Sequence, residues 1–263
     1  MVLHLENAIK ASIKAGEAIL EIYKEDFEVA YKADESPLTA ADQSADSVIK
    51  SILANSFPIL SEEGKSISFE ERKNWETFWL VDPLDGTKEF IKKNGEFTVN
   101  IALIKNGLPI LGVVYLPVAS MLYFGAEGIG SYACQLGSEE ENFDLQQLFK
   151  NGEKLGEKEF PAIFTIVASR SHLSKETEDF INSCKEKHGV VDLISKGSSI
   201  KLCLVAERKA HVYPRVAPTM EWDTAAAHAV AKYAGCKVLN YDTREELVYN
   251  KENLLNPSFI VLA

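Results

Sequence analysis

The stretch from Asn106 to Ala126 carries no charged side chain and is long enough to cross a bilayer as a helix. It begins, however, within the hairpin turn signal Lys105-Asn106-Gly107, and it contains two prolines. The segments Val113–Tyr115 and Met121–Phe124 consist largely of residue types that favour strands. We therefore predict a meandering, buried sheet in this part of the chain rather than a transmembrane helix.

The rest of the first half predicts elements that can pack against such a sheet. Apolar residues recur at helical spacing over residues 3–23, and a second helix is expected from Thr39 to Phe57. Strands are expected at Phe27–Lys32, Ile59–Glu63, Trp75–Val81, Phe97–Ile104, Ile110–Leu116 and Met121–Ala126. The pattern indicates an α+β unit whose sheet is mostly antiparallel.

The composition changes after residue 137. Residues 138–159 are rich in acids and poor in large apolar side chains, which is typical of a solvated connection. From residue 160 onward, strand and helix signals alternate, as they do in an α/β layer. We therefore predict an N-terminal domain of residues 1–137, an acidic connection of residues 138–159 and a C-terminal domain of residues 160–263, with a cleft between the domains.

The charge balance narrows the range of partners. The chain has 28 Lys and Arg residues against 39 Asp and Glu residues, a net charge of 28 − 39 = −11. A protein that binds a nucleic-acid backbone needs Lys and Arg to displace counterions, so nucleic acid is not an expected partner. A small phosphate-bearing molecule can still bind where local cations reverse the sign of the field.

The sequence predicts an intracellular protein. Glu6 and Lys10 follow Met1 closely, with no apolar segment of the kind found in signal peptides. The four cysteines show neither a CxxC motif nor a zinc-binding spacing, and we expect them to be buried free thiols. We expect a cytoplasmic monomer or homodimer without a transmembrane segment; peripheral membrane association is left open.

Two aspartates and a threonine follow a predicted strand in the segment Leu80-Val81-Asp82-Pro83-Leu84-Asp85-Gly86-Thr87. Pro83 and Gly86 favour a tight turn, around which the two carboxylates can face one point. Hard divalent cations such as Mg²⁺ prefer oxygen ligands of this kind. Thr87 can cap a helix over Lys88–Ile91, whose first N–H groups would suit a phosphate. A turn with a capping threonine and two solvated aspartates explains the segment equally well.

Three other segments place acids beside predicted elements. Glu62 and Glu63 end a strand, and because adjacent strand residues point to opposite faces, only one of them is expected to face a cleft. Asp223 precedes the Ala-rich helix at 225–234 and can serve as its N-cap. Asp42 lies in the first turn of the helix that begins near Thr39, where it can interact with the helix dipole.

Taken together, these segments resemble the signature of the inositol monophosphatase superfamily of lithium-sensitive, Mg²⁺-dependent phosphatases. The match is carried by Ser61-Glu62-Glu63, Asp82–Thr87 and Trp222-Asp223-Thr224-Ala225-Ala226. Further segments resemble the CysQ branch, whose members are 3′(2′),5′-bisphosphate nucleotidases; they are Ser36–Asp42, Lys88–Ile91, Asn94–Asn100, Gly197–Lys201, Tyr213–Arg215 and Leu255–Pro257. A chance match to one short motif does not explain a resemblance that runs from Ser36 to the C-terminus.

The resemblance implies a layered αβαβα sandwich of the inositol monophosphatase and fructose bisphosphatase type, with the active site between two subdomains. It implies two to three Mg²⁺ ions, held by Glu63, Asp82, the backbone carbonyl of Leu84, Asp85 and Asp223. By the same resemblance, Thr87 and Asp42 are the catalytic pair that orients the attacking water and accepts its proton.

The resemblance also implies a substrate and the residues that bind it. The substrate-binding set is Glu63, Leu84, Asp85, Gly86, Thr87, His172, Ser198, Lys201, Arg215 and Asp223. Within this set, Lys201 and Arg215 would hold a second phosphate away from the metals. The implied reaction is hydrolysis of adenosine 3′,5′-bisphosphate to AMP and phosphate, in sulfur assimilation. The alternatives are an inositol monophosphatase or other sugar-phosphate phosphatase, and a nucleotide sensor without turnover.

Overall fold

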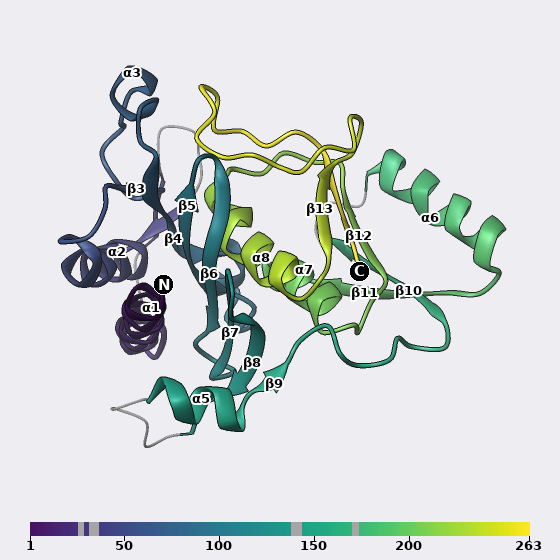
Figure 1. Cartoon of the computed structure of the whole chain (residues 1–263), viewed down its shortest axis with the longest axis horizontal. Helices are drawn as coiled ribbons and strands as arrows, with labels where there is room; N and C mark the ends of the chain where they lie inside the picture. Colours follow the sequence, from purple (N-terminus) through teal and green to yellow (C-terminus); the bar gives the residue numbers. More distant parts are fainter. Residues whose placement is uncertain (26–28, 32–36, 138–143, 170–173) are drawn as a thin grey trace.

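A computed structural model of the chain describes residues 1–25, 29–31, 37–137, 144–169 and 174–263. Its helices are α1 (Val2–Tyr23), α2 (Ala40–Leu53), α3 (Phe69–Arg72), α4 (Thr87–Ile91), α5 (Leu145–Asn151), α6 (Lys175–His188), α7 (Ile200–Ala206) and α8 (Trp222–Tyr233). They alternate with two large sheets in space, as Figure 1 shows.

The larger sheet has seven strands in the order β3-β4-β5-β6-β7-β8-β9. These are β3 (Ile59–Ser61), β4 (Thr77–Asp85), β5 (Thr98–Lys105), β6 (Leu108–Leu116), β7 (Met121–Ala126), β8 (Gly130–Gln135) and β9 (Glu153–Lys154). Strands β3 and β4 pair in parallel, and the remaining neighbours are antiparallel. The uncharged stretch from Asn106 to Ala126 contains β6 and β7, so its interpretation as buried sheet is confirmed.

The second sheet has five strands in the order β11-β10-β12-β14-β13. These are β10 (Phe164–Ser169), β11 (Val191–Lys196), β12 (Val212–Arg215), β13 (Lys237–Asn240) and β14 (Phe259–Leu262). Strand β10 pairs in parallel with both β11 and β12, whereas β14 is antiparallel to β12 and β13. A small sheet of β1 (Val29–Tyr31) and β2 (Pro37–Thr39) lies apart from both.

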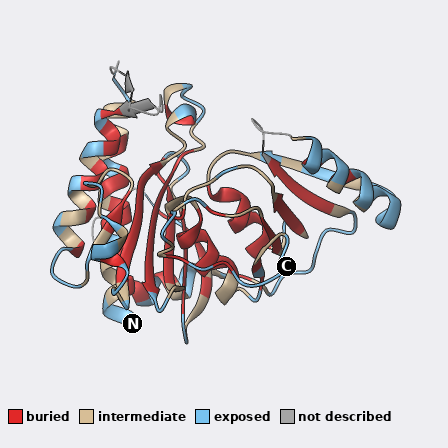
Figure 2. Ribbon diagram, turned by 90° about the horizontal axis from the view of Figure 1, so that it is seen from above, coloured by how far each residue is buried: buried red, intermediate tan, exposed pale blue. Residues whose placement is uncertain are grey.

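Three apolar clusters hold the layers together. One joins α1 and α2 to one face of the larger sheet. A second fills the space between its other face, α7 and α8, and the second sheet. The third lies between the second sheet and α6. The order of layers is therefore helix, sheet, helix, sheet, helix, which confirms the predicted αβαβα sandwich; Figure 2 shows the buried residues concentrated in its sheets and inner helices.

Helix α8 lies unusually close to the larger sheet. It is rich in alanine, and the alanines on its buried face present little bulk. Gly112 of β6 lies directly beneath it, and a Cβ atom at this position would come within 2.1 Å of the Ala226 carbonyl oxygen. The missing side chain is therefore what allows the helix to approach, and it brings the N-terminal turn of α8 close to the end of β4.

The structure extends the sequence prediction around residues 138–159 but leaves the proposed domain division as a prediction. Within residues 144–159 it forms α5 and β9, and β9 joins the larger sheet beside β8. Neither these elements nor β8 was expected from the sequence. Leu145 and Leu148 of α5 are buried, so a weak apolar signal was present within the acidic stretch.

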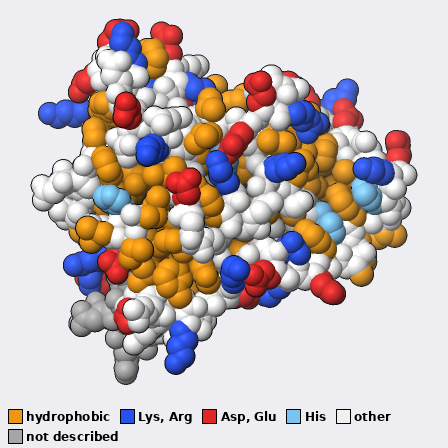
Figure 3. Space-filling view, viewed as in Figure 1, with side chains coloured by type: hydrophobic (Ala, Val, Ile, Leu, Met, Phe, Trp, Pro, Cys, Tyr) orange, Lys and Arg blue, Asp and Glu red, His pale blue; other side chains and the backbone are white. Residues whose placement is uncertain are grey.

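The distribution of charge and three of the four cysteines match the expectations from the sequence. On the face shown in Figure 3, Lys and Arg side chains are interspersed with Asp and Glu rather than gathered in one region. All four cysteines are free thiols; Cys134, Cys203 and Cys236 are buried as expected, whereas Cys184 on α6 is only partly buried. Among the helices of the described residues, none combines the length and apolar character that a membrane span requires.

Candidate active site

A cavity with a volume of about 330 Å³ lies where the end of β4 faces the second sheet. One wall comes from the larger sheet and the start of α4, and the other from the loop before α7, from β12 and from the first turn of α8. Its acidic residues are Glu62, Asp82, Asp85, Glu89 and Asp223. Lys88, Lys196, Lys201 and Arg215 also line it, so the cavity brings both signs of charge together.

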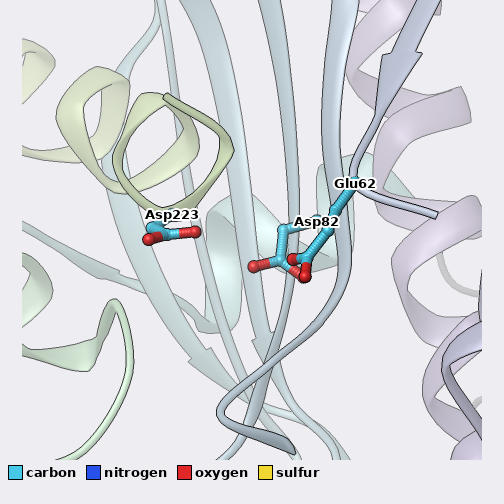
Figure 4. Close-up of side chains that lie close together, drawn as sticks. All are labelled: Glu62, Asp82 and Asp223. Carbon is cyan, nitrogen blue, oxygen red and sulfur yellow. The ribbon is translucent and has the colours of Figure 1, made fainter. Parts of the chain in front are cut away.

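Three carboxylates converge in this cavity. Glu62, Asp82 and Asp223 each offer a carboxylate oxygen, and these oxygens lie within 4.8 Å of one another. Figure 4 shows Glu62 and Asp82 side by side, Glu62 just after β3 and Asp82 within β4, with Asp223 facing them from α8. Residues from both halves of the chain thus meet at one point, and an all-oxygen donor set of this kind suits a hard divalent cation.

Strand register explains why Glu62 meets Asp82. In the parallel pair, Leu60 lies opposite Leu80, and both side chains belong to the apolar cluster on the α8 side of the sheet. Glu62 and Asp82 come two residues later on the two strands, so they point to that same face. Pairing also continues past the end of β3, because the Glu62 N–H donates to the Val81 carbonyl at 3.1 Å.

Burial and mutual repulsion make this cluster costly without a cation. Burial raises the pKa of Asp82 well above its ordinary value, and the charges of Glu62, Asp85 and Asp223 raise it further. Burial and the charge of Asp85 likewise raise the pKa of Asp223. A divalent cation among these groups would remove the repulsion and favour their ionised forms. The donor set therefore fits a metal on physical grounds.

Asp85 lies outside this trio and faces the opposite wall of the cavity. Its Oδ2 atom accepts a hydrogen bond of 2.6 Å from the Ser199 N–H and one of 3.4 Å from the Thr98 hydroxyl. Burial raises its pKa to about 6, although Lys201 and the Ser199 N–H act in the other direction. Asp85 thus connects the carboxylates of the larger sheet with the cations across the cavity.

Thr87 and Asp42 are in direct contact at the start of α4. The Thr87 hydroxyl donates to Asp42 Oδ1 at 3.2 Å, and the Leu84 carbonyl lies 3.4 Å from the same hydroxyl. The other oxygen of Asp42 accepts from the N–H of Thr39 at 2.8 Å and from its hydroxyl at 2.7 Å. This capping box fixes the buried Asp42 carboxylate, leaving one of its oxygens directed at Thr87.

The opposite wall carries the cations. Lys201 is buried in the first turn of α7, and burial lowers the pKa of its ammonium to about 8, against the raising effect of Asp85. The ammonium lies 5.7 Å from the centroid of the Tyr213 ring and donates to the Ser198 carbonyl. Arg215, two residues after Tyr213 on β12, donates to the Pro218 carbonyl at 3.1 Å, and its buried Nε meets no hydrogen-bond partner within the described part of the chain.

Comparison with known proteins shows which family the chain belongs to. The family model described as "Inositol monophosphatase family" matches residues 3–260. The chain belongs to the inositol monophosphatase family. It is 42% identical over 262 residues to the 3′(2′),5′-bisphosphate nucleotidase CysQ of Salmonella typhimurium, covering 98% of each chain. It is 43% identical to the protein of the same name from Escherichia coli (strain K12), again over 98% of each.

A solved structure shows the same architecture. The crystal structure of CysQ from Bacteroides thetaiotaomicron, described as a bacterial member of the inositol monophosphatase family, matches with a TM-score of 0.91 and 55% identity. The match covers 99% of this chain and 97% of that one. The inositol monophosphatase of Thermotoga maritima matches at 21% identity and a TM-score of 0.73, which shows the shared fold.

For this inositol monophosphatase family member, the structure corrects the expected choice between the two glutamates. Glu62, not Glu63, belongs to the carboxylate trio and lines the cavity. The physical reason is strand alternation: Ser61 points toward α2, where its hydroxyl donates to Asp46 at 2.6 Å, so the next residue faces the cavity. Glu63 follows in a turn closed by the Gly64 N–H and the Ser61 carbonyl. The same alternation, read from Leu60, could have identified Glu62 from the sequence.

The position of Glu62 leads to a prediction about how phosphatase activity depends on the Mg²⁺ concentration. Replacing Glu62 with Gln should raise the Mg²⁺ concentration that gives half-maximal phosphatase activity by at least about tenfold, because one charged oxygen is lost from the trio. Glu63→Gln removes the same charge one residue away and serves as the matched control. It should leave that concentration within about twofold. Equal effects of the two substitutions would show that the alternation argument is wrong.

Two helix caps also differ from expectation. Gly86, with φ 96°, is the residue before α4, and Thr87 is the first helical residue rather than the cap. Glu221 precedes α8, and Asp223 lies within its first turn, where its carboxylate accepts from the Met220 N–H at 2.8 Å. Both side chains are thus left to face the cavity. Ser198, Lys201, Arg215, Leu84 and Gly86 line it as well, whereas His172 lies outside the described residues.

The raised pKa of Asp85 predicts how the metal-free protein responds to pH. Because its pKa is about 6 in the folded chain against an ordinary value of 3.8, folding favours the protonated carboxyl. That contribution is complete below pH 3.8 and is lost as the pH rises through about 6. In EDTA, Asp85→Asn should therefore raise the melting temperature above pH 6 by about 5 °C and have little effect near pH 4. A difference of the same size at both pH values would contradict the assignment.

Proposed function

We propose that this chain is a Mg²⁺-dependent phosphatase that hydrolyses adenosine 3′,5′-bisphosphate to AMP and phosphate. The observation that carries the proposal is the cavity itself, which has a carboxylate trio on one wall and two cations, Lys201 and Arg215, on the other. A substrate with two separate phosphates matches this division of charge. A polyol monophosphate would occupy only the carboxylate side once metals are bound.

Glu62, Asp82 and Asp223, together with Asp85 and the Leu84 carbonyl, would hold two to three Mg²⁺ ions. When bound, Mg²⁺ supplies positive charge that attracts the phosphate and makes a nearby water easier to deprotonate. Backbone hydrogen bonds fix two of these carboxylates in position. The Leu84 N–H donates to Asp82 at 3.0 Å, and the Met220 N–H donates to Asp223 at 2.8 Å.

Thr87 and Asp42 would place the attacking water and take its proton. The Thr87 hydroxyl donates to Asp42, so its lone pairs remain available to accept a hydrogen bond from a water in the cavity. Asp42 is fixed by the capping box and can accept the proton through Thr87. Gly86 and Thr87 line the same region, and their backbone N–H groups would bind phosphate oxygens.

Lys201 and Arg215 would bind the second, 5′ phosphate. An ammonium whose pKa is lowered by burial gains most from a dianionic ligand, because that ligand replaces the solvation which burial removed. The relatives named 3′(2′),5′-bisphosphate nucleotidase support this choice of substrate. The reaction would serve sulfur assimilation, and we propose a cytoplasmic monomer or homodimer as its form.

The deciding experiment is a comparison of substrates. Phosphate release is measured with adenosine 3′,5′-bisphosphate, adenosine 3′-monophosphate and inositol 1-phosphate, each with Mg²⁺ and with EDTA. We expect Mg²⁺-dependent turnover with kcat/KM highest for the bisphosphate by at least about tenfold. A preference for inositol 1-phosphate would assign a sugar-phosphate phosphatase instead, and binding of the bisphosphate without turnover of any substrate would assign a sensor.

A further inference from the structure

The loop before α7 lines the cavity, and hydrogen bonds hold it against the larger sheet at two points, here called fastenings. Residues 196–199, here called the cavity loop, connect β11 to α7, and all four line the cavity. The loop belongs to the second sheet by sequence, yet its hydrogen bonds run to the segment that leads into β5 and to Asp85. What fixes the loop therefore also fixes the distance between the two walls.

The first fastening is made by Glu96. Its Oε1 atom pairs with the Lys196 ammonium at 3.0 Å, and its Oε2 atom accepts from the Gly197 N–H at 3.0 Å. The Glu96 side chain is 15% exposed and the Lys196 side chain 42% exposed, so these charge-assisted contacts are partly shielded from water. Gly197 is held tightly as well, since a Cβ atom there would lie 3.2 Å from Glu89 Cγ.

The second fastening is made by Ser199. Its N–H donates to Asp85 Oδ2 at 2.6 Å, and its hydroxyl donates to Asn100 Oδ1 at 2.7 Å. The hydroxyl of Thr98 lies 3.0 Å from that of Ser199. These contacts are independent of Glu96, so they should persist when Glu96 is removed.

Ser198 lies between the two fastenings in a conformation that needs support. Its φ of 39° is in the left-handed region, which a residue other than glycine adopts only where its surroundings impose it. Its buried hydroxyl has no hydrogen-bond partner among the residues that the structure describes, and its carbonyl accepts from the Lys201 ammonium. If Ser198 relaxed, its carbonyl would rotate and Lys201 would lose this partner.

We propose that Glu96 is a positioning residue for substrate selection. By holding Lys196 and Gly197, it keeps Ser198 in its left-handed conformation and so keeps the Lys201 ammonium aimed into the cavity. Glu96 touches neither the carboxylate trio nor the reacting phosphate; it acts through the cavity loop. This inference rests on the proposed function, because it assigns Lys201 to the second phosphate of the substrate.

The test separates binding of the second phosphate from chemistry. Glu96→Ala should raise KM for adenosine 3′,5′-bisphosphate by about tenfold while leaving kcat within about twofold, since the partly buried charge-assisted contacts of Glu96 with the cavity loop are lost. KM for adenosine 3′-monophosphate, which lacks the second phosphate, should not change. Lys196→Met removes only the ion pair and should raise KM for the bisphosphate about twofold to fivefold. Glu70→Ala, which breaks an exposed ion pair on α3, is the matched control.

Amide hydrogen exchange gives a readout that does not depend on turnover. Exchange across residues 194–200 should speed up in metal-free Glu96→Ala but not in Glu70→Ala. Unchanged exchange together with an unchanged KM ratio between the two nucleotides would overturn the inference.

If the wild-type enzyme itself showed no preference for the bisphosphate, the proposed function would fail. Faster exchange in Glu96→Ala would still support the role of Glu96 in holding the cavity loop. Should Glu96→Ala fail to fold, Glu96→Gln and Lys196→Met carry the same comparison, and a wild-type KM ratio in both would overturn it.

Discussion

Asp82→Asn should lower kcat/KM by about 10³-fold or more, because Asp82 lies at the centre of the carboxylate trio and its loss exceeds that of a single hydrogen-bond donor. The same substitution should stabilise the metal-free protein at neutral pH. Asp82 is buried beside Glu62, Asp85 and Asp223, and each of these charges opposes its ionisation. An isosteric amide removes the repulsion and keeps the shape. We therefore expect a variant that is more stable in EDTA yet inactive.

Thermal unfolding with and without Mg²⁺ provides the measurement. The wild-type melting temperature should rise when Mg²⁺ is added, as it does for any ligand that binds only the folded state, and the rise should be absent or much smaller in Asp82→Asn. Asp192→Asn, on the exposed part of β11, is the control and should retain both activity and the Mg²⁺ response. Full Mg²⁺-dependent turnover by Asp82→Asn would rule out the proposed metal site.

Replacing Lys201 and Arg215 together by Ala should remove the preference for a bisphosphate. Both cations line the wall opposite the trio, and Lys201 is buried there with its pKa lowered to about 8. Losing two charge-assisted contacts to one phosphate should lower kcat/KM for adenosine 3′,5′-bisphosphate by about 10²- to 10³-fold. The value for adenosine 3′-monophosphate should change much less, because it lacks the phosphate that these side chains would bind.

The ratio of the two kcat/KM values is the quantity to measure, because it cancels general damage to the fold. Lys154→Ala, at an exposed ion pair with Glu157, tests whether loss of any cation has the same effect. A double variant that keeps the wild-type ratio would place the second phosphate elsewhere. A parallel fall with both nucleotides would indicate that the cations act on the trio, through Asp85, rather than on the substrate.

Much of this architecture could be predicted from the sequence because it rests on local patterns. Strand-favouring residue types and turn residues located β4 to β7, and the alternation of strands with helices located the second sheet. The acids at the ends of strands marked the cavity wall. The pairing of Asp42 with Thr87 was expected from the family resemblance rather than from a local pattern, and the structure places the Thr87 hydroxyl 3.2 Å from Asp42 Oδ1.

The remaining features depend on contacts between distant segments. Parallel register between β3 and β4 decides that Glu62 rather than Glu63 joins Asp82. The expectation of Glu63 came from the family resemblance and not from the strand alternation that begins at Leu60. The fastening of the cavity loop by Glu96 joins residues about a hundred positions apart, and no local pattern signals it. Strand β9 is two residues long and exists only because β8 offers it an edge.

The close approach of α8 to β6 bears on how inherited or selected variants of this enzyme should be interpreted. With Gly112 replaced by Ala, the added methyl group would meet the Ala226 carbonyl at 2.1 Å, so the helix must shift outward and carry Asp223 with it. Activity should then fall sharply, although Gly112 lines no part of the cavity. Loss-of-function alleles are accordingly expected in the middle of a strand that touches neither metal nor nucleotide, and mapping them onto the reaction centre alone would miss their cause.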